Sequence, residues 1–240
     1  MPVDVGGVKI GGEMFVRDYL YQYYSSLDPN SHGGTGGSVS DISGNNQDAS
    51  KQDITWATYY WNFAVNNDDI SQIDFPNFGM TGDVVAQDWS WELWIYPTDL
   101  TGIGGIIMLG NKTSSFGFDR GNTANTIRAG ISNSAGTSYN VTSNSLITSR
   151  WYHLVLTYNG TGDDKARLYV DGSIVGTSGA SSGAFSETGV IRMGATRVLV
   201  GTQASERYKG GLAVFRIYNR TLDADEVRYN FSCERGAFGK

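Results

Sequence analysis

The chain has 240 residues, of which 40% are hydrophobic and 12% aromatic, enough to bury the core of one large all-β domain or two small ones. The formal charge of −6, with no clustered basic patch, disfavours nucleic acid as a partner. No stretch approaches the roughly 18 apolar residues that would insert into a membrane, and the single cysteine, Cys233, excludes an intrachain disulfide.

Residues 1–18 are predicted to form a thin N-terminal arm. They are rich in glycine and offer few residues suited to a core. Such arms are usually disordered or bound to a partner. The chain opens without the cationic start, apolar core and cleavage site of a secretion signal. We therefore expect a protein that is made in a host cytoplasm and not exported.

The first strand candidate is "YLYQYYSSL" at residues 19–27. Residues 28–50 follow as a polar loop full of turn formers, and loops of this length are functional or mobile. In residues 59–75, aromatic and β-branched residues are interrupted by Asn66-Asn67, which predicts a hairpin.

The segment "WSWELWIYP", residues 89–97, alternates strictly. One face would carry Trp89, Trp91, Leu93 and Ile95. Because Trp94 and Tyr96 place aromatic area on the opposite face too, we predict a strand in the middle of a sheet. Residues 104–111 and 115–121 are predicted to pair as strands, with residues 126–132 beside them.

Residues 150–176, "RWYHLVLTYNGTGDDKARLYVDGSIVG", give the clearest strand pattern. A Gly/Asp loop returns the chain from the first strand into "ARLYV". Asp171-Gly172 then predicts a two-residue turn, since both central positions of a type I′ turn need positive φ. The pattern therefore predicts two short β-strands joined by that turn.

Residues 190–195 and 210–220 supply two more strands, and "DADEVRYNF" supplies one helix. Asp223 is its predicted N-cap, with Glu226 at the capping-box spacing. Many short strands, frequent turns and one late helix predict an all-β fold, a two-sheet antiparallel jelly-roll sandwich with a short C-terminal helix.

Several of these blocks resemble a known family. "RWYHLVLTYNG", "ARLYVDGSIVG", "IRMGA" and "YKGGLAVFRIYNRTLDADEV" are similar to successive blocks of laminin-G-like, concanavalin A-like lectin/glucanase jelly rolls. The resemblance covers residues 19–232 and implies one domain of that fold, followed by a tail at 233–240. It is more specific for the fold than for the ligand.

The opening blocks "YSSLDPNS", "DISGNNQDAS" and "WNFAVNNDDISQIDF" resemble the start of bacteriophage tail and surface proteins, marine ones especially. This resemblance implies a non-enzymatic virion structural protein that decorates a capsid or forms part of a tail or fibre. Its partners would be other virion proteins, further copies of itself and cell-surface glycans. A free calcium-dependent lectin is the alternative, and a polysaccharide hydrolase or lyase is the third.

Catalytic residues are not predicted. Hydrolases of this fold place an acid and a nucleophile as E-x-D-x-x-E or E-x-D-x-E, and retaining chemistry needs two carboxyls about 5 Å apart. No two of the six glutamates lie within five residues of each other. His153 falls where the family has a structural histidine, and His32 lies in a Gly-rich loop without a suggested partner. Neither supports a catalytic triad or a zinc site.

Calcium is the one cofactor that the sequence suggests. Related lectin folds often hold this ion with carboxylates and backbone carbonyls from flexible loops. The segment "DISGNNQD" offers Asp41, Asn45 and Asp48, although an Asx-rich turn that bonds its own backbone explains them as well. Weaker alternatives are Asp119 with Asn122, and Asp68 with Asp69.

A glycan site would combine aromatic platforms with amides and charged groups at a rim or on a concave sheet. Each rim candidate could equally be an ordinary surface residue, and the six tryptophans are expected in the core. The candidates are Asn111, Asp119, Arg120, Asn122, Tyr139, Arg197 and Tyr208.

Overall fold

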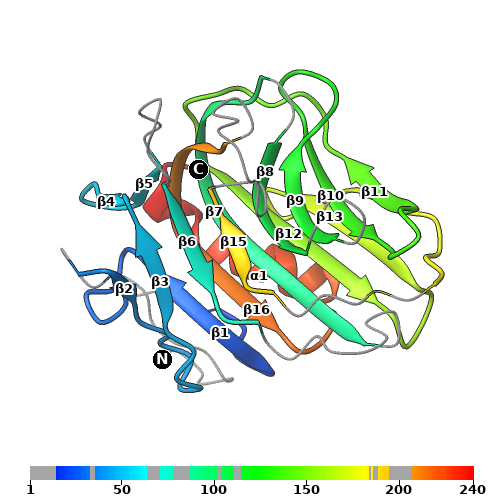
Figure 1. Ribbon diagram of the computed structural model, residues 1–240, viewed down its shortest axis with the longest axis horizontal. Helices are drawn as coiled ribbons and strands as arrows, with labels where there is room; N and C mark the ends of the chain where they lie inside the picture. Colours follow the sequence, from blue (N-terminus) through cyan, green and yellow to red (C-terminus); the bar gives the residue numbers. More distant parts are fainter. Residues whose placement is uncertain are drawn as a thin grey trace.

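The computed structural model describes residues 15–32, 36–63, 71–77, 87–101, 104–110, 115–183, 185, 189–194 and 207–240. These residues form two sheets packed face to face, with one helix on the outside (Figure 1). The strand pairs within both sheets are antiparallel. The predicted two-sheet jelly-roll sandwich with one short C-terminal helix is confirmed.

One sheet, called the back sheet here, has the order β14-β13-β12-β7-β16-β5-β4, and β1 also pairs with β16. Its strands are β14 (Ser173–Thr177), β13 (Lys165–Val170), β12 (Tyr152–Asn159), β7 (Asp88–Asp99), β16 (Lys209–Tyr218), β5 (Trp61–Phe63), β4 (Thr55–Trp56) and β1 (Leu20–Ser25). Helix α1 (Ala224–Glu234) and the 3-10 turn η3 (Arg235–Phe238) cover its outer face.

The other sheet, called the front sheet, has the order β11-β10-β9-β8-β15-β6-β3-β2. Its strands are β11 (Ser138–Thr142), β10 (Ile127–Ser132), β9 (Ser115–Arg120), β8 (Gly104–Gly110), β15 (Ile191–Met193), β6 (Gln72–Phe75), β3 (Ala49–Gln52) and β2 (Ser38–Val39). In the view of Figure 1 its strands lie nearer the reader than α1 does.

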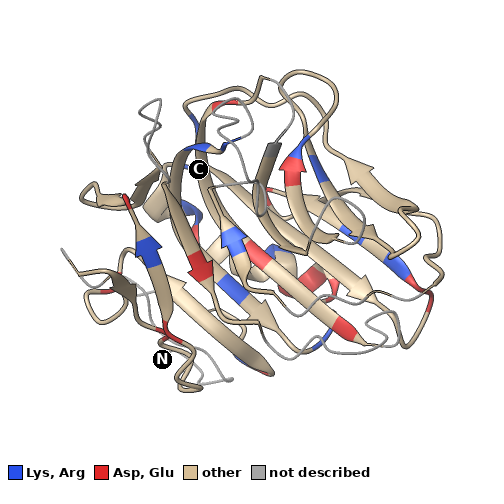
Figure 2. Cartoon of the chain, in the orientation of Figure 1, with Lys and Arg blue, Asp and Glu red and all other residues tan. Residues whose placement is uncertain are grey.

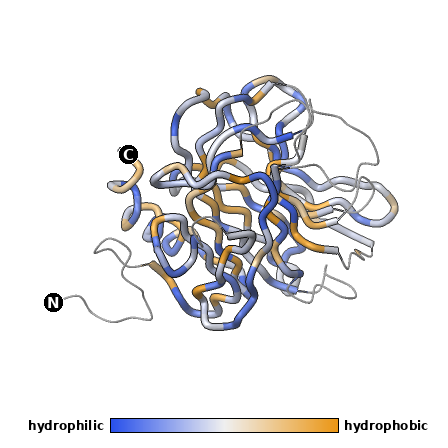
Figure 3. Tube along the Cα trace, turned by 60° about the vertical axis from the view of Figure 1, so that its left-hand side comes forward, coloured by the Kyte–Doolittle hydropathy of each residue, from blue (hydrophilic) through white to orange (hydrophobic). Residues whose placement is uncertain are grey.

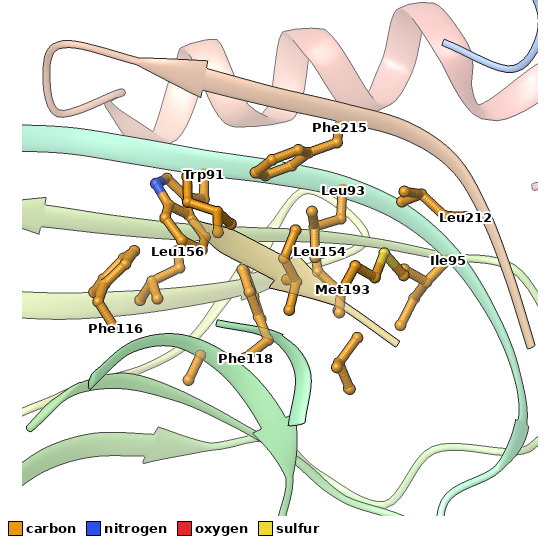
Figure 4. Packing of buried hydrophobic residues seen from close by; sticks show 14 of the residues in the cluster. Trp91, Leu93, Ile95, Phe116, Phe118, Leu154, Leu156, Met193, Leu212 and Phe215 are labelled. Carbon is orange, nitrogen blue, oxygen red and sulfur yellow. The ribbon is translucent and has the colours of Figure 1, made fainter. Parts of the chain in front are cut away.

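The core lies between the two sheets and follows the alternation of β7. Trp91 and Leu93 point inward against front-sheet residues such as Phe116, whose ring stands edge-on to Trp91 at 4.5 Å (Figure 4). Trp94 points the other way, into a second cluster under η3. Hydrophobic segments accordingly run through the middle of the molecule in Figure 3. β7 pairs with β12 and β16, so its predicted central position is confirmed.

Two local predictions hold in detail. Asp171 and Gly172 have φ of 49° and 75°, as a type I′ turn requires, and they join β13 to β14. Asp223 caps α1, its side chain accepting from the backbone of Glu226 while the Glu226 side chain accepts from the Asp223 backbone. Both features depend on residues adjacent in sequence, which is why the sequence predicts them well.

The hairpin predicted over residues 59–75 is wrong. β5 pairs with β4 and β16 in the back sheet, whereas β6 pairs with β3 and β15 in the front sheet. The chain therefore crosses from one sheet to the other, and Asn66-Asn67 lie outside the described residues. Alternating burial identifies each strand but does not select its partner. The short, largely polar strands β2, β3, β4 and β11 were not predicted.

The folded domain extends further at both ends than predicted. Phe15, assigned to an arm at 1–18, is 1% exposed and contacts Tyr23, with the two ring centroids 4.9 Å apart. Phe238, assigned to a tail at 233–240, stacks on Trp94 at 4.0 Å. Single apolar residues in polar or Gly-rich segments give no periodic signal, so their burial is decided by tertiary packing.

Cys233 is partly exposed and forms no disulfide. Within the described part of the chain, no helix has the length and hydropathy that crossing a bilayer would require.

Candidate functional site

The outer face of the front sheet carries the candidate site. Phe116 and Phe118 of β9 are buried toward the core, so Gly117 and Asp119 face outward by alternation. The same rule turns Arg128 of β10 outward, because Ile127 and Ala129 on either side of it are buried in the core. We call this surface the front face.

A continuous row of paired residues crosses the front face. From β15 to β11 it runs through Arg192, Met108, Gly117, Gly130 and Asn140, each paired with the next. A Cβ at Gly117 would lie 2.2 Å from a backbone oxygen of β8, and one at Gly130 would lie 2.3 Å from a backbone oxygen of β11. Only glycine fits at these two positions. The two glycines add no side chains of their own, but both are buried, and the Asn140 amide oxygen lies close over Gly130.

Two bidentate ion pairs stand on this face. The Arg192 guanidinium donates to both carboxylate oxygens of Asp74, at 2.6 and 2.7 Å. Arg128 likewise donates to both oxygens of Asp119, at 3.0 and 2.6 Å. All four side chains are 15–28% exposed. Figure 2 shows the opposite charges side by side on β6 and β15, and on β9 and β10.

The ion pairs affect the ionisation of their members. Burial raises the pKa of the Asp119 carboxyl, and the hydrogen bond and charge of Arg128 offset only part of this effect. The hydrogen bond to Asp74 raises the pKa of Arg192. Each pair joins one positive to one negative group, so the two pairs add no net charge to the front face.

Hydroxyl groups line the next row of the same face. Ser132 pairs with Ser115 on one side and Ser138 on the other, and the Oγ atoms of Ser132 and Ser138 are 2.8 Å apart. Together with the Asn140 amide and the two ion pairs, these hydroxyls offer both donors and acceptors. Such a surface can bind a hydroxyl-rich ligand by hydrogen bonds.

The front-face carboxylates are not spaced for glycoside hydrolysis. Asp74 on β6 and Asp119 on β9 are separated by three strand-to-strand steps, roughly 14 Å at about 4.8 Å each. Retaining and inverting enzymes need about 5 Å and 6.5–9.5 Å, respectively. These two residues therefore cannot act on one glycosidic bond in this arrangement.

Two carboxylates do meet elsewhere, on the outer face of the back sheet. Arg216 contacts both Glu92, at 3.3 Å, and Glu234, with which it forms a bidentate pair. His153 Nε2 lies 2.7 Å from a Glu92 oxygen, and the indole of Trp94 donates to Glu234 at 2.8 Å. These residues are at most 4% exposed. The group lies under α1 and is inaccessible to substrate.

The buried group also fixes the ionisation of Glu92. Burial raises its pKa, but the charge of Arg216 and the hydrogen bonds from His153 and Tyr218 outweigh this effect and lower the pKa to about 2. The Glu92 carboxyl is therefore ionised at neutral pH. His153 is a fully buried residue packed in this group, in agreement with the predicted structural role.

Among the predicted glycan residues, Asp119 lies on the front face. Arg120, its neighbour on β9, points to the opposite side and is 1% exposed, donating to the Thr101 carbonyl at 2.6 Å. Tyr208 is fully buried, and its hydroxyl donates to the Gly211 carbonyl at 2.9 Å. The rim positions predicted for Arg120 and Tyr208 are thus wrong. Strand alternation buries the first, and the core between the sheets encloses the second.

The remaining candidates are scattered. Asn122 is exposed in the loop after β9. Tyr139 lies partly against the core, and its hydroxyl is 2.9 Å from Ser182 Oγ. Asn111 and Arg197 lie outside the described residues. The described candidates do not gather in one site.

Arg128, Asn140 and the aligned glycines Gly117 and Gly130 were not predicted as site residues from the sequence. The pattern "FGFD" on β9 and "RAGI" on β10 already places glycines and charges on one side of two adjacent strands. Only the register between β9 and β10 shows that these residues lie next to one another, and the sequence does not specify that register.

The candidate calcium residues are brought together in one loop, but mainly by bonds to the protein itself. The Asp41 carboxylate accepts from the backbone of Tyr23, Ser43 and Gln47 at 2.9–3.0 Å. An Asp48 oxygen accepts from the Asp41 backbone at 2.9 Å. The Asn45 side-chain amide donates to the Tyr21 carbonyl at 2.9 Å. This arrangement is an Asx turn, and calcium binding by it stays a prediction.

Calcium binding at the two weaker alternatives also stays a prediction. Asp119 is committed to Arg128, and Asp68 with Asp69 lies outside the described residues. In the described ranges, no cluster of three or more His, Cys, Asp or Glu side chains could hold a metal ion.

Comparison with known proteins gives one family and many solved structures. A family model described as concanavalin A-like lectin/glucanases superfamily matches residues 67–228, about two thirds of the chain. No curated protein matches the sequence.

Among solved structures, the Trypanosoma rangeli sialidase in complex with sialic acid is 17% identical, with a TM-score of 0.69. The match covers 99% of this chain and 36% of that one. The binding domain of botulinum neurotoxin serotype D is 16% identical with a TM-score of 0.68, over 90% of this chain and 52% of that one. A structure of botulinum neurotoxin type C, titled for its interaction with two ganglioside molecules, is 15% identical with a TM-score of 0.68, covering 90% and 51%.

The chain thus spans about a third to a half of the length of these structures. At such identities the likeness establishes a shared fold and does not transfer an activity or a ligand.

Proposed function

The chain belongs to the concanavalin A-like lectin/glucanases superfamily, and from that premise we propose that it is a non-enzymatic glycan-binding head. The observation that carries the proposal is the front face, where two arginines held in bidentate ion pairs share one surface with the Asn140 amide and a row of serine hydroxyls. The neighbours solved with sialic acid or titled for gangliosides are consistent with this ligand class.

The chemistry of the front face suits a glycan. Arg128 and Arg192 are held in bidentate pairs, so their orientation is fixed before a ligand arrives. Asn140 supplies an amide on the same face. Sugar hydroxyls both donate and accept, and a few well-oriented polar groups match that requirement.

The absence of catalysis is part of the proposal. It is supported by the wide separation of Asp74 and Asp119 and by the burial of Glu92 and Glu234. Because each of these carboxylates is also engaged by arginine, none is placed to act as acid or nucleophile within the described part of the chain.

We further propose that the head works on a virion surface, as a capsid decoration or as part of a tail or fibre. This proposal is supported by the resemblance of residues 24–31, 41–50 and 61–75 to the opening of phage tail and surface proteins. Since residues 15–18 belong to the folded domain, the segment proposed to dock is residues 1–14. Removing residues 1–14 should then abolish incorporation into particles and leave the head folded. Full incorporation of the truncated chain would contradict the docking role.

Glycan binding is tested on an array of neutral and sialylated oligosaccharides, with and without a chelator. We expect the wild type to bind, and Asn140→Ala and Arg128→Met to reduce binding without unfolding the chain. Tyr229→Ala, on the exposed side of α1, is the matched control. Loss of binding on chelation would favour the alternative of a calcium-dependent lectin. Absence of binding to every oligosaccharide, or release of sugar, would contradict the proposal.

A further inference from the structure

The β4–β5 hairpin exposes aromatic side chains at one edge of the back sheet, far along the sheet order from β14 (Figure 1). Trp56 is 40% exposed and Tyr59 is 64% exposed. Side chains of this size are usually enriched where a protein binds something, because their apolar surface is costly to leave in water.

The Trp56 ring is held in place from two directions. His32 lies parallel to it, with centroids 4.6 Å apart and an interplanar angle of 14°. The indole N–H donates to the Ser26 carbonyl at 3.2 Å. Because His32 covers one face of the indole, a ligand that stacks on Trp56 would use the opposite face.

Tyr59 is hydrogen-bonded to the same residue, Ser26. The buried Ser26 hydroxyl donates to the Tyr59 carbonyl at 2.6 Å, so one residue fixes the positions of both aromatics. Thr58, between them, has a φ of 56°, which is unusual for a β-branched residue. Tyr60, the residue after Tyr59, packs inward against Trp151, with the two ring centroids 5.7 Å apart. The turn thereby directs Tyr60 into the domain and leaves Tyr59 outside.

The segment that carries His32 is also ordered. Asp28 accepts from the backbone of Asn30 at 2.8 Å, and its carbonyl accepts from the backbone of Ser31 and His32. Ser31 is buried and donates to the Ser40 carbonyl at 2.6 Å. We call the three rings of His32, Trp56 and Tyr59 the aromatic platform.

We propose that the aromatic platform is a second glycan-binding site, which stacks one face of a neutral pyranose ring on Trp56 and Tyr59. The inference rests on the proposed function for its ligand class, but it concerns a different surface from the front face. An aromatic ring has a negative face, which attracts the positively polarised C–H groups of a sugar. Exposed polar residues nearby in sequence, such as Asn30, can bond the hydroxyls at the ring edge.

The surrounding charges argue against other ligands that stack on aromatic rings. Residues 25–32 and 52–63, which build the platform, contain Asp28 and Asp53 but no Lys or Arg. Phosphate-bearing ligands, including nucleotides, need cationic partners. A quaternary ammonium group is typically enclosed by several aromatic walls, whereas His32 already covers one face of Trp56.

The test measures binding of lactose, cellotetraose and mannotriose by NMR titration of the full chain, following the Trp56 indole N–H signal. We expect at least one sugar to shift this signal. Tyr59→Ala should weaken binding of that sugar roughly three- to tenfold, the range expected for loss of one stacking contact. Tyr19→Ala, which removes a tyrosine that is 72% exposed elsewhere, is the matched control and should bind as the wild type does.

Two further variants separate this inference from the proposed function. If a sugar binds the wild type and Asn140→Ala weakens it, while Tyr59→Ala and Trp56→Phe have no effect, the platform inference is wrong and the front face stands. If only the platform variants weaken binding, the platform is the glycan site and the role of the front face is wrong. If no sugar binds, or if the platform captures only a protein partner, the inference is overturned.

Discussion

Both outer faces of the sandwich carry arginine–carboxylate ion pairs, but the pairs differ in their exposure to solvent. On the back sheet, Arg216 joins Glu92 and Glu234 in a group that is at most 4% exposed. On the front sheet, Arg128 and Arg192 pair with aspartates that are 15–18% exposed. The exposure differs because only the back-sheet group is covered by other parts of the chain. Helix α1, η3 and Phe15 close over the first group.

This comparison shows why pairing alone does not identify a functional site. A fully buried carboxylate pair bridged by arginine stabilises the attachment of α1 and cannot meet a ligand. A half-buried pair on an open sheet is held in orientation and can still contact one.

Replacing Arg216 with methionine should destabilise the domain by about 3–5 kcal/mol, because Glu92 and Glu234 would be left charged and buried. Urea unfolding measures the change. If Arg216→Met does not fold, the triple variant with Glu92→Gln and Glu234→Gln removes the stranded charges and should fold. A loss below about 1 kcal/mol for Arg216→Met would show that the back face does not depend on the ion pair.

Phe238→Ala should cost roughly 3 kcal/mol, since Phe238 is 7% exposed and stacks on Trp94 in the cover of the back sheet. Thermal unfolding is the measurement, with Tyr229→Ala on the exposed side of α1 as the control. An unchanged Tm would mean that the C-terminal turn is not part of the cooperative unit.

Acid should lower the stability that the ionised Glu92 gives to the back face. The pKa of Glu92 is lowered to about 2 in the folded state, against 4.5 ordinarily. A depressed carboxyl pKa gives stability that is present above the unfolded pKa and lost as pH falls toward the folded one. Between pH 7 and pH 3 this one group should account for a loss of about 2 kcal/mol.

The measurement is the urea midpoint as a function of pH. Glu92→Gln should give a shallower decline between pH 5 and pH 3 than the wild type. Equal slopes in the two proteins would contradict the lowered pKa.

On the front face, Arg128→Met should change stability by about 1 kcal/mol or less, because its ion pair is partly exposed to solvent. Its effect on glycan binding should be larger than its effect on unfolding. Measuring both in one variant sharpens the comparison with Arg216→Met. A loss of stability as large as that of Arg216→Met would end the distinction between the faces.

The smallest effect is expected from calcium. Asp41 is already bonded to three backbone N–H groups, so its loop is ordered by its own hydrogen bonds. We expect the Tm in millimolar calcium to exceed that in chelator by no more than about 1–2 °C. A larger rise that Asp41→Asn removes would establish the predicted site.

Features that depend on neighbours in sequence can be predicted from the sequence alone. The alternation of β7 gave both its central position and its two faces. Asp171-Gly172 gave the turn, and Asp223 with Glu226 gave the start of α1. In each case, backbone geometry couples residues that are one to three positions apart, so composition and spacing carry the information.

Other features were decided only in three dimensions. No spacing rule relates Glu92 to Glu234, yet one arginine joins them. Tyr208 resembled a rim residue and is enclosed in the core. Asp119 lies on the front face, but its pairing with Arg128 and the alignment of Gly117 with Gly130 are set by the strand register. Pairing between distant strands is set by burial of whole faces, which a linear sequence does not specify.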